Sequence, residues 1–261
     1  MSSAAETHGG PVAGADEGPV LAAHGVGVDF DGVHALTDVT LSVGQHEVLG
    51  LIGPNGAGKT TLMNVLSGFQ RPTTGSIHVA GEDATRWGPE RIVRSGVSRT
   101  FQAVRPFAQL TVSENLELGA LGVGVSRTEA RRRVAEILSA LHLTHRADFR
   151  AGALPHGEER RLGIGRALAS SPRVLLLDEP AAGANESESD QLVHALLAIK
   201  SDFACSLVVI EHDMQLIMNI CERIHVLDYG RSIAEGTPEE IRKNPAVLEA
   251  YLGQGTAAAH A

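Results

Sequence analysis

The sequence predicts an α/β protein whose core is a mainly parallel sheet. A phosphate-loop motif, GPNGAGKT at 53–60, stands between a segment of strand character at 47–52 and one of helix character at 60–66. Two continuous apolar runs, at 174–177 and 207–210, are typical of strands that are buried on both faces. Helical patterns separate these runs, and strands that alternate with helices usually pair in parallel.

The first part of the chain predicts an antiparallel β-region after an unstructured leader. Residues 1–20 are rich in Gly, Ala, Ser and Pro and have no apolar periodicity, so we expect them to be disordered. The segments 24–30 and 39–43 alternate like strands, with Asp31-Gly32 as a turn signal between them. Residues 253–261 resemble the leader in composition, and we expect a flexible tail there.

The phosphate loop carries residue types suited to a nucleoside triphosphate. Its glycines lack a Cβ, which lets successive backbone N–H groups turn toward phosphate oxygens, and the following helix N-terminus adds a partial positive charge. Lys59 supplies a mobile charge for the β- and γ-phosphates, and the Thr60 hydroxyl is suited to coordinating Mg²⁺. The motif and its strand and helix context together predict a nucleotide-binding protein.

After the loop, the pattern predicts two short strands and then a helical region over about 103–170. The strands are expected at 76–80 and at 97–101, the second ending at Gln102. Thr111 and Ser126 each stand three residues before a glutamate, which is capping-box spacing. The second box opens a helix with one apolar face, formed by Ala130, Val134, Ile137, Leu138 and Leu141. The three consecutive arginines of this helix, at 131–133, are interpreted as part of a solvated face, with a basic binding patch as the alternative.

The second half of the chain repeats the alternation of helix and buried strand. A helical pattern at 160–170 leads into the apolar run at 174–177. A helix at 186–200 is predicted to begin after Asn185 as its N-cap, and a further helix at 214–220 follows the second apolar run.

Two carboxylates follow the first buried strand, where open α/β sheets place their ligands. Asp178 is the expected Mg²⁺ partner, and Glu179 is placed to orient or deprotonate an attacking water. After the second buried strand, the imidazole of His212 is suited to hydrogen-bond a γ-phosphate. A pair of acids at a strand end or a single surface histidine would mean little alone, but the phosphate loop gives both a catalytic interpretation.

Composition limits the classes of function. The chain has 261 residues, 43% of them hydrophobic, which is enough to bury a core. Its apolar runs are far shorter than the roughly 20 residues of a membrane-spanning helix, so any membrane attachment is expected to go through a protein partner. The formal charge of -9 opposes binding to nucleic acid. The chain has only two cysteines, Cys205 and Cys221, and the positively charged start of a secretory signal is missing. We therefore expect the protein in a reducing cytoplasm.

In the order of these motifs, the chain resembles the ATP-binding cassette (ABC) family over about 21–252. Phe30 occupies the position of the family's adenine-stacking aromatic residue. Residues 53–60 match its Walker A loop, and Gln102 matches its Q-loop. Leu154-Pro155-His156-Gly157-Glu158 occupies the place of its signature, ahead of a Walker B strand, with Glu179 as catalytic base and His212 as switch histidine.

The resemblance implies ATP and Mg²⁺ as cofactors and assigns residues to each. The implied Mg²⁺ ligands are Thr60, Gln102 and Asp178. The implied nucleotide contacts are Phe30, Gly53, Pro54, Asn55, Gly56, Ala57, Gly58, Lys59, Thr60, Thr61, Gln102, the signature residues Leu154, Pro155, His156, Gly157 and Glu158, and Asn185. In this family the signature completes the site of a second cassette, so that two subunits enclose two ATP molecules. The implied architecture is a P-loop cassette with a parallel core sheet, an antiparallel β subdomain and a helical subdomain.

The chain departs from the family pattern in the signature and in the D-loop. Pro155 replaces the usual signature Ser and removes a hydroxyl donor to the γ-phosphate, while Glu158 replaces the Gln. Asn185 replaces the usual D-loop Asp, which keeps hydrogen bonding but removes a charge. These departures leave a nucleotide-binding regulator without turnover as an alternative.

Within the family, the segments SRTFQ at 98–102, LPHGEERRL at 154–162 and EHDM at 211–214 look like the ATPases of branched-chain amino acid importers. That implies a homo- or heterodimer with a second ATPase subunit, two transmembrane permease subunits, an indirect link to a solute-binding protein, and a place on the cytoplasmic face of the membrane. Related ATPases serve urea or other small organic solutes. A cassette that acts on nucleic acid or the ribosome is a further alternative, but the chain lacks the second cassette, the insertions and the basic patch expected of it.

Overall fold

The core of the protein is a six-stranded sheet in a computed structural model that describes residues 18–100 and 106–257. The strand order is β10-β9-β3-β8-β7-β6, and all neighbours are parallel except β10 and β9. The strands are β3 (Val48–Ile52), β6 (Val97–Arg99), β7 (Val174–Asp178), β8 (Ser206–Ile210), β9 (Arg223–Asp228) and β10 (Arg231–Gly236). This confirms the predicted mainly parallel α/β core.

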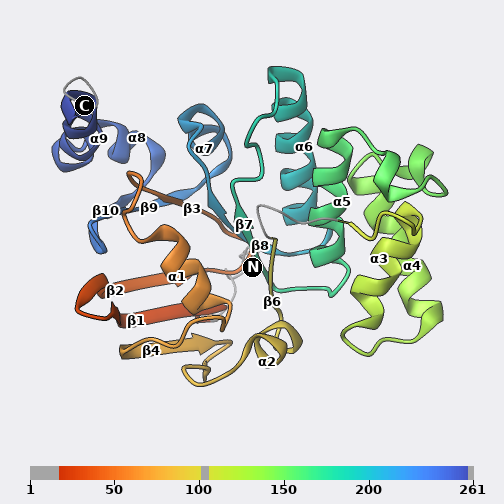
Figure 1. Ribbon diagram of the computed structural model, residues 1–261, viewed down its shortest axis with the longest axis horizontal. Coiled ribbons are helices and arrows are strands. Elements are labelled where there is room, and N and C mark those ends of the chain that lie inside the picture. The colour runs from red at the N-terminus through yellow and green to blue at the C-terminus, as the bar shows by residue number, and fades with distance from the viewer. Residues whose placement is uncertain (1–17, 101–105, 258–261) are drawn as a thin grey trace, which may run out of the picture.

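A second, antiparallel sheet precedes the phosphate loop and continues after it, as Figure 1 shows in red and orange. Its order is β2-β1-β4-β5, with bounds β1 (Leu21–Phe30), β2 (Val33–Val43), β4 (Thr74–Val79) and β5 (Glu82–Asp83). Asp31 and Gly32 form the turn between β1 and β2, and both have positive φ angles, 45° and 90°. The predicted antiparallel start is therefore confirmed, with β2 longer than the sequence pattern indicated.

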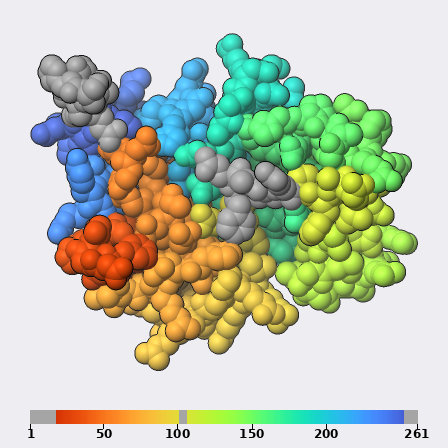
Figure 2. Space-filling view, in the orientation of Figure 1, coloured from red at the N-terminus to blue at the C-terminus, as the bar shows by residue number. Residues whose placement is uncertain are grey.

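Helices cover the core sheet and form a separate group at one side, the yellow and green part of Figures 1 and 2. That group contains α3 (Val112–Leu121), α4 (Arg127–Ala140), two short 3₁₀ turns, η1 (Thr144–Arg146) and η2 (Ala151–Ala153), and α5 (His156–Leu168). The remaining helices are α1 (Lys59–Leu66), α2 (Pro89–Arg94), α6 (Glu186–Asp202), α7 (Met214–Ile220), α8 (Pro238–Lys243) and α9 (Pro245–Ala257). None of the helices in the described ranges is long and apolar enough to cross a membrane.

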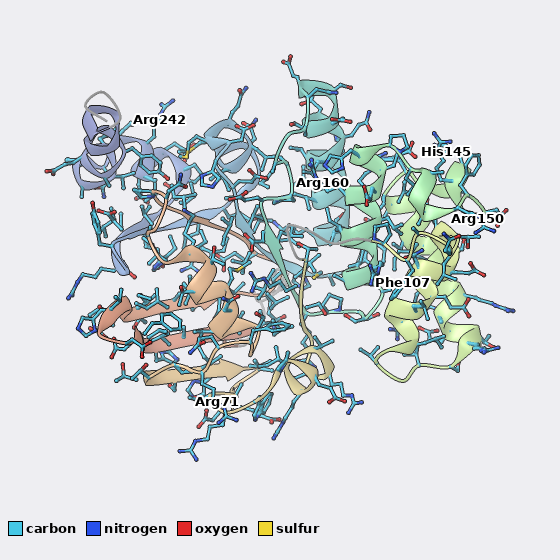
Figure 3. The ribbon with its side chains drawn as sticks, in the orientation of Figure 1. Arg71, Phe107, His145, Arg150, Arg160 and Arg242 are labelled. Carbon is cyan, nitrogen blue, oxygen red and sulfur yellow. The ribbon has the colours of Figure 1, made fainter. Side chains whose placement is uncertain are left out.

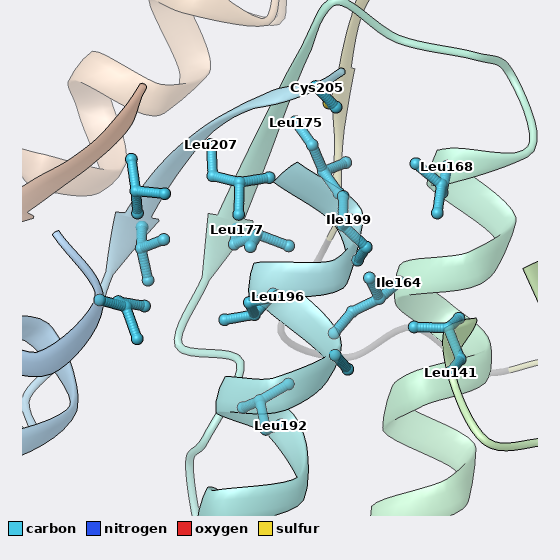
Figure 4. Packing of buried hydrophobic residues seen from close by; sticks show 14 of the residues in the cluster. Leu141, Ile164, Leu168, Leu175, Leu177, Leu192, Leu196, Ile199, Cys205 and Leu207 are labelled. Carbon is cyan, nitrogen blue, oxygen red and sulfur yellow. The ribbon is translucent and has the colours of Figure 1, made fainter. Parts of the chain in front are cut away.

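Alternation along the central strands divides the interior into two hydrophobic clusters. Leu175 and Leu177 of β7 point to the cluster that contains α5 and α6, whose packing Figure 4 shows. Val174 and Leu176 belong to the opposite cluster, where α1 packs between the two sheets. Because neighbouring strand residues point to opposite faces, a continuous apolar run can fill both clusters. This is why the runs at 174–177 and 207–210 lack the polar alternation of a surface strand.

Capping residues fix several helix starts where the sequence predicted them. Thr111 accepts a hydrogen bond from Glu114 N and forms a full capping box, and Ser126 accepts one from Glu129 N. Asn185 caps α6 through Glu188 in the same reciprocal way. On the solvated face of α4, Arg132 pairs with Glu129 and Glu136. This agrees with the interpretation of the arginines at 131–133 as part of a solvated face.

Other boundaries differ from the sequence pattern. Helix α5 begins at His156, earlier than the predicted 160, because Pro155 with φ -57° serves as its N-cap and its first turn is polar. Helix α9 runs to Ala257, past the point at 253 where a tail was predicted. Strands β9 and β10 and helices α2, α8 and α9 were not predicted. The leader at 1–17, Gln102 and the end of the predicted strand 97–101 lie outside the described residues.

Candidate functional site

The phosphate loop lies between β3 and α1, as predicted, and its backbone depends on glycine. Gly58 precedes α1 with φ 100°, and a Cβ at this position would lie 2.8 Å from Ala35 O. At Gly53, with φ 149°, a Cβ would lie 2.0 Å from Leu227 O. L-residues rarely adopt such φ values, and neither approach leaves room for a side chain. The fold itself therefore requires glycine at Gly53 and Gly58.

A cleft of about 480 Å³ opens over this loop and collects residues from distant parts of the chain. Loop and helix residues 55–61 form one wall. Glu179, Ile210 and His212 come from the ends of β7 and β8. The remaining lining residues are Val33, His34, Ala35, Tyr229 and Gly230. The cleft thus lies at the C-terminal ends of parallel strands, where open α/β sheets bind ligands.

Lys59 is almost buried and faces both acids of the β7 end. It is 7% exposed, and its Nζ donates to Gly53 O at 2.6 Å and to Pro54 O at 2.9 Å. Burial lowers the pKa of Lys59, while the negative charges of Glu179 and Asp178 oppose that shift. Its ammonium therefore belongs to the same electrostatic cluster as the two predicted acids.

Glu179 and His212 contact each other directly at the edge of the cleft. Glu179 Oε1 lies 2.7 Å from His212 Nε2, and the side chains are 22% and 50% exposed. The backbone of Glu179 has a φ of 49°, and its N–H donates to Ile210 O at 2.9 Å. Side chains in sparsely populated backbone regions are frequent at functional sites. The structure brings together the two residues that sequence reasoning assigned to catalysis.

Asp178 is engaged by a residue that sequence reasoning did not select. Arg99 Nη2 lies 2.8 Å from Asp178 Oδ2, and Arg99 Nη1 donates to Asn64 Oδ1 at 2.6 Å. An arginine within the predicted strand 97–101 was the available signal. With Thr60 at the first turn of α1, Asp178 supplies an oxygen ligand of the type that Mg²⁺ prefers. In the described parts of the chain no group of three His, Cys, Asp or Glu residues is placed to hold a metal ion.

Other predicted residues lie away from the cleft of their own chain. Phe30 ends β1 and is 46% exposed, but it does not line the cleft, whereas Tyr229 does and is 85% exposed. The signature residues 154–158 also lie elsewhere, around the start of α5. There, Glu158 Oε2 accepts a hydrogen bond from Arg146 Nε at 2.8 Å, and His156 is exposed. Asn185 is engaged as the cap of α6. Tyr229 was not predicted because the turn between β9 and β10 was missed, and His34 was not predicted because it lies in the part of β2 before 39.

Comparisons with known proteins agree with this architecture. The ABC transporter family model matches residues 36–182, more than half of the chain. A second model, of the branched-chain amino acid ATP-binding cassette transporter, matches 231–257. A Pseudomonas aeruginosa protein, the high-affinity branched-chain amino acid transport ATP-binding protein BraF, is 41% identical over 251 residues, which is 90% of this chain and 98% of the relative. The Escherichia coli protein LivG, which has the same description, is 40% identical with the same coverage.

Solved structures give the same result. The ADP conformation of an ATP-binding cassette of an ABC transporter superposes with a TM-score of 0.81 at 31% identity, over 90% of this chain and 99% of that one. A nucleotide-free cassette superposes with a TM-score of 0.80 at 32% identity, over 89% and 98% of the two chains. The family model covers the phosphate loop, Asp178 and Glu179. The chain therefore belongs to the ABC transporter family, as one of its ATP-binding cassettes.

Proposed function

We propose that this chain is the ATP-hydrolysing subunit of an importer for branched-chain amino acids. The observation that carries the proposal is the cleft, which brings the phosphate loop, Glu179 and His212 together from three separate segments. The cargo is supported by the descriptions of the relatives and by the family model that matches the C-terminal segment. Urea or another small organic solute is the alternative cargo.

We assign roles to this chain's residues from their positions. The N–H groups of the loop and the Lys59 ammonium would bind the phosphates of ATP. Mg²⁺, bound with the nucleotide, would neutralise charge on the phosphate oxygens, and Thr60 and Asp178 would hold it. Gln102 would be its third ligand, from the segment outside the described residues. Glu179 would take a proton from the attacking water, and His212, 2.7 Å away, would orient that carboxylate.

The proposed partners follow from the surfaces that one chain leaves unused. The signature segment 154–158 lies outside the cleft, so its proposed role is to complete the nucleotide site of a second cassette, together with Asn185. Two permease subunits would hold the dimer at the cytoplasmic face of the membrane, and a solute-binding protein would act indirectly. The charge of -9 supports a protein partner over nucleic acid.

Uptake measurements test the cargo and the need for hydrolysis together. A strain that lacks this chain is complemented with the wild type or with the Glu179→Gln variant, and uptake of labelled leucine, valine and urea is measured. We expect leucine and valine uptake to return with the wild type alone, while urea uptake is unaffected throughout. Restored urea uptake without leucine uptake would contradict the cargo. Full restoration by the Glu179→Gln variant would instead contradict an ATP-driven role and favour a regulator without turnover.

A further inference from the structure

Glu211 is a buried carboxylate between two residues that line the cleft, Ile210 and His212. It follows the last residue of β8 and is 4% exposed, although it does not line the cleft itself. A buried ionised carboxylate is costly unless hydrogen-bond donors surround it. Burial raises the pKa of Glu211, and backbone N–H groups of Ala181, His212 and Asp213 oppose this shift. The carboxylate is thus stabilised by main-chain donors from two different loops.

These two loops are the ones that carry the proposed catalytic residues. Glu211 Oε1 accepts a hydrogen bond from Ala181 N, two residues after Glu179. Its Oε2 accepts one from His212 N at 3.1 Å. Glu211 therefore links the backbone beyond Glu179 to the backbone of His212.

Further contacts hold the segment that carries Glu179. His212 is half-exposed, and the left-handed backbone of Glu179 is held by its hydrogen bond to Ile210 O. In the same segment, Ala182 O accepts a hydrogen bond from Arg160 of α5, which is labelled in Figure 3. Ala181 and Ala182 are consequently held from β8 by Glu211 and from the helical group by Arg160. A catalytic group needs to be held within a fraction of an ångström, and such supporting contacts achieve this.

We propose that Glu211 is a positioning residue for hydrolysis, which fixes the Glu179 carboxylate relative to His212. The inference rests on the proposed function and adds a residue to its machinery. Glu211 does not line the cleft, so it acts through the two loops whose backbone it contacts. Replacement by Gln keeps the size of the side chain, but one carboxylate oxygen becomes an NH2 group. That group cannot accept the hydrogen bond from the backbone N–H that it faces. One loop then loses its hydrogen bond, and the carboxylate of Glu179 moves relative to the phosphate loop.

The test measures ATP hydrolysis by the purified full-length chain. Glu211→Gln is made in the wild type and in the Glu179→Gln background, and phosphate release is followed at varied ATP concentrations. We expect kcat to fall about 10²-fold in the wild-type background, the size of effect that a 1 Å misplacement causes, with KM nearly unchanged. In the Glu179→Gln background the same change is expected to have no further effect, because the group that Glu211 positions is already absent.

A matched control and a second variant keep the result interpretable. Glu240 also accepts a backbone N–H, from Thr237 at 2.8 Å, but it caps α8 away from the cleft, so Glu240→Gln should leave kcat unchanged. If Glu211→Gln does not fold, Glu211→Asp keeps the charge, withdraws the carboxylate by one methylene and should show the same dependence on Glu179. Equal losses of kcat in both backgrounds, or a rise in KM alone, would overturn the inference while the proposed function stands. A wild-type chain without ATPase activity would overturn both.

Discussion

Arg99 and Asp178 form an ion pair in the interior, with Arg99 Nη2 2.8 Å from Asp178 Oδ2 and only 5% and 12% of the two side chains exposed. The pair joins the end of β6 to the end of β7, and Arg99 Nη1 extends the link to Asn64 on α1. Three elements that surround the phosphate loop therefore meet at a single guanidinium. The same carboxylate is the proposed magnesium ligand, so this contact also sets its orientation.

Removing the arginine of this pair should destabilise the protein strongly. Arg99→Met removes the hydrogen-bonded partner of the buried Asp178 carboxylate, and we expect the free energy of unfolding to fall by about 3–5 kcal/mol. Arg94→Met is the control, since its pair with Glu90 is 62% and 78% exposed and should contribute less than about 1 kcal/mol. Urea unfolding followed by circular dichroism measures both values. Similar losses of unfolding free energy in the two variants would show that the buried Arg99 pair stabilises the protein no more than the exposed Arg94 pair does.

Lys59→Ala should abolish tight ATP binding. Lys59 is the only lysine among the described residues that line the cleft, and the other donors of the loop are neutral. Lys243→Ala removes an exposed lysine at the end of α8 and serves as the control for net charge. Isothermal titration with ATP and Mg²⁺ distinguishes the variants. An unchanged dissociation constant in Lys59→Ala would rule out this loop as the nucleotide site.

Phe30 is predicted to stack on adenine, although Tyr229 is the aromatic that lines the cleft. We expect Phe30→Ala to weaken ATP binding by about 1–3 kcal/mol, the range of base stacking on aromatic side chains, and to leave tripolyphosphate binding unchanged. Phe149→Ala is the matched control, because Phe149 is 49% exposed and contacts Arg146 away from the cleft. If Tyr229→Ala weakens ATP binding and Phe30→Ala does not, the adenine ring stacks on Tyr229 and not on Phe30.

The buried His225 should make the protein less stable as the pH falls. It is 1% exposed, and its Nδ1 and Nε2 lie 2.7 Å from Glu235 Oε2 and 2.8 Å from Ser232 Oγ. Burial lowers the pKa of His225, against the opposing charge of Glu235. As the pH falls, His225 is therefore protonated in the unfolded chain before it is protonated in the folded protein. The contribution of neutral His225 to stability is fully present above the unfolded pKa of about 6.5 and is lost as the pH falls below it.

His225→Gln removes this titration and keeps an amide that can hydrogen-bond. Urea unfolding at intervals from pH 7.5 to 5 should give a shallower decline for His225→Gln than for the wild type. The control His142→Gln changes an exposed histidine in the turn after α4 and should keep the wild-type slope. Parallel curves for His225→Gln and the wild type would show that His225 does not contribute to the pH dependence.

Glu179→Gln should separate ATP binding from turnover. The change keeps the shape of the side chain but removes the carboxylate that would accept the proton from water. We expect hydrolysis to fall by roughly 10²- to 10⁴-fold, the contribution of a general base, while ATP and Mg²⁺ still bind and an ATP-bound dimer accumulates. Gel filtration with and without nucleotide, beside a phosphate-release assay, measures both effects.

The exposed Glu90→Gln provides the control for this experiment and should behave like the wild type. Hydrolysis near the wild-type rate in Glu179→Gln would exclude Glu179 as the base, and His212 would then be the residue to replace. A monomer in the presence of ATP would contradict the proposed closed dimer, even if turnover is lost.

Local features of this chain could be predicted from sequence because their causes are local. The phosphate loop needs glycine at Gly53 and Gly58 for backbone reasons, and Asn185 caps α6 through a residue three positions along the chain. The apolar runs in β7 and β8 predict strands that are buried on both faces, and the order of the motifs identifies the family. Each of these signals occupies a short stretch that periodicity or spacing can detect.

Tertiary structure decided the contacts between segments that are remote in sequence. Arg99 meets Asp178 because β6 pairs with β7 at one register, and Glu211 reaches Ala181 because β7 and β8 are neighbours. Tyr229 reaches the cleft because β9 pairs with β3 and returns through a turn to β10. Strand order and register depend on how the whole sheet packs against its helices, so no single stretch of sequence encodes these pairs.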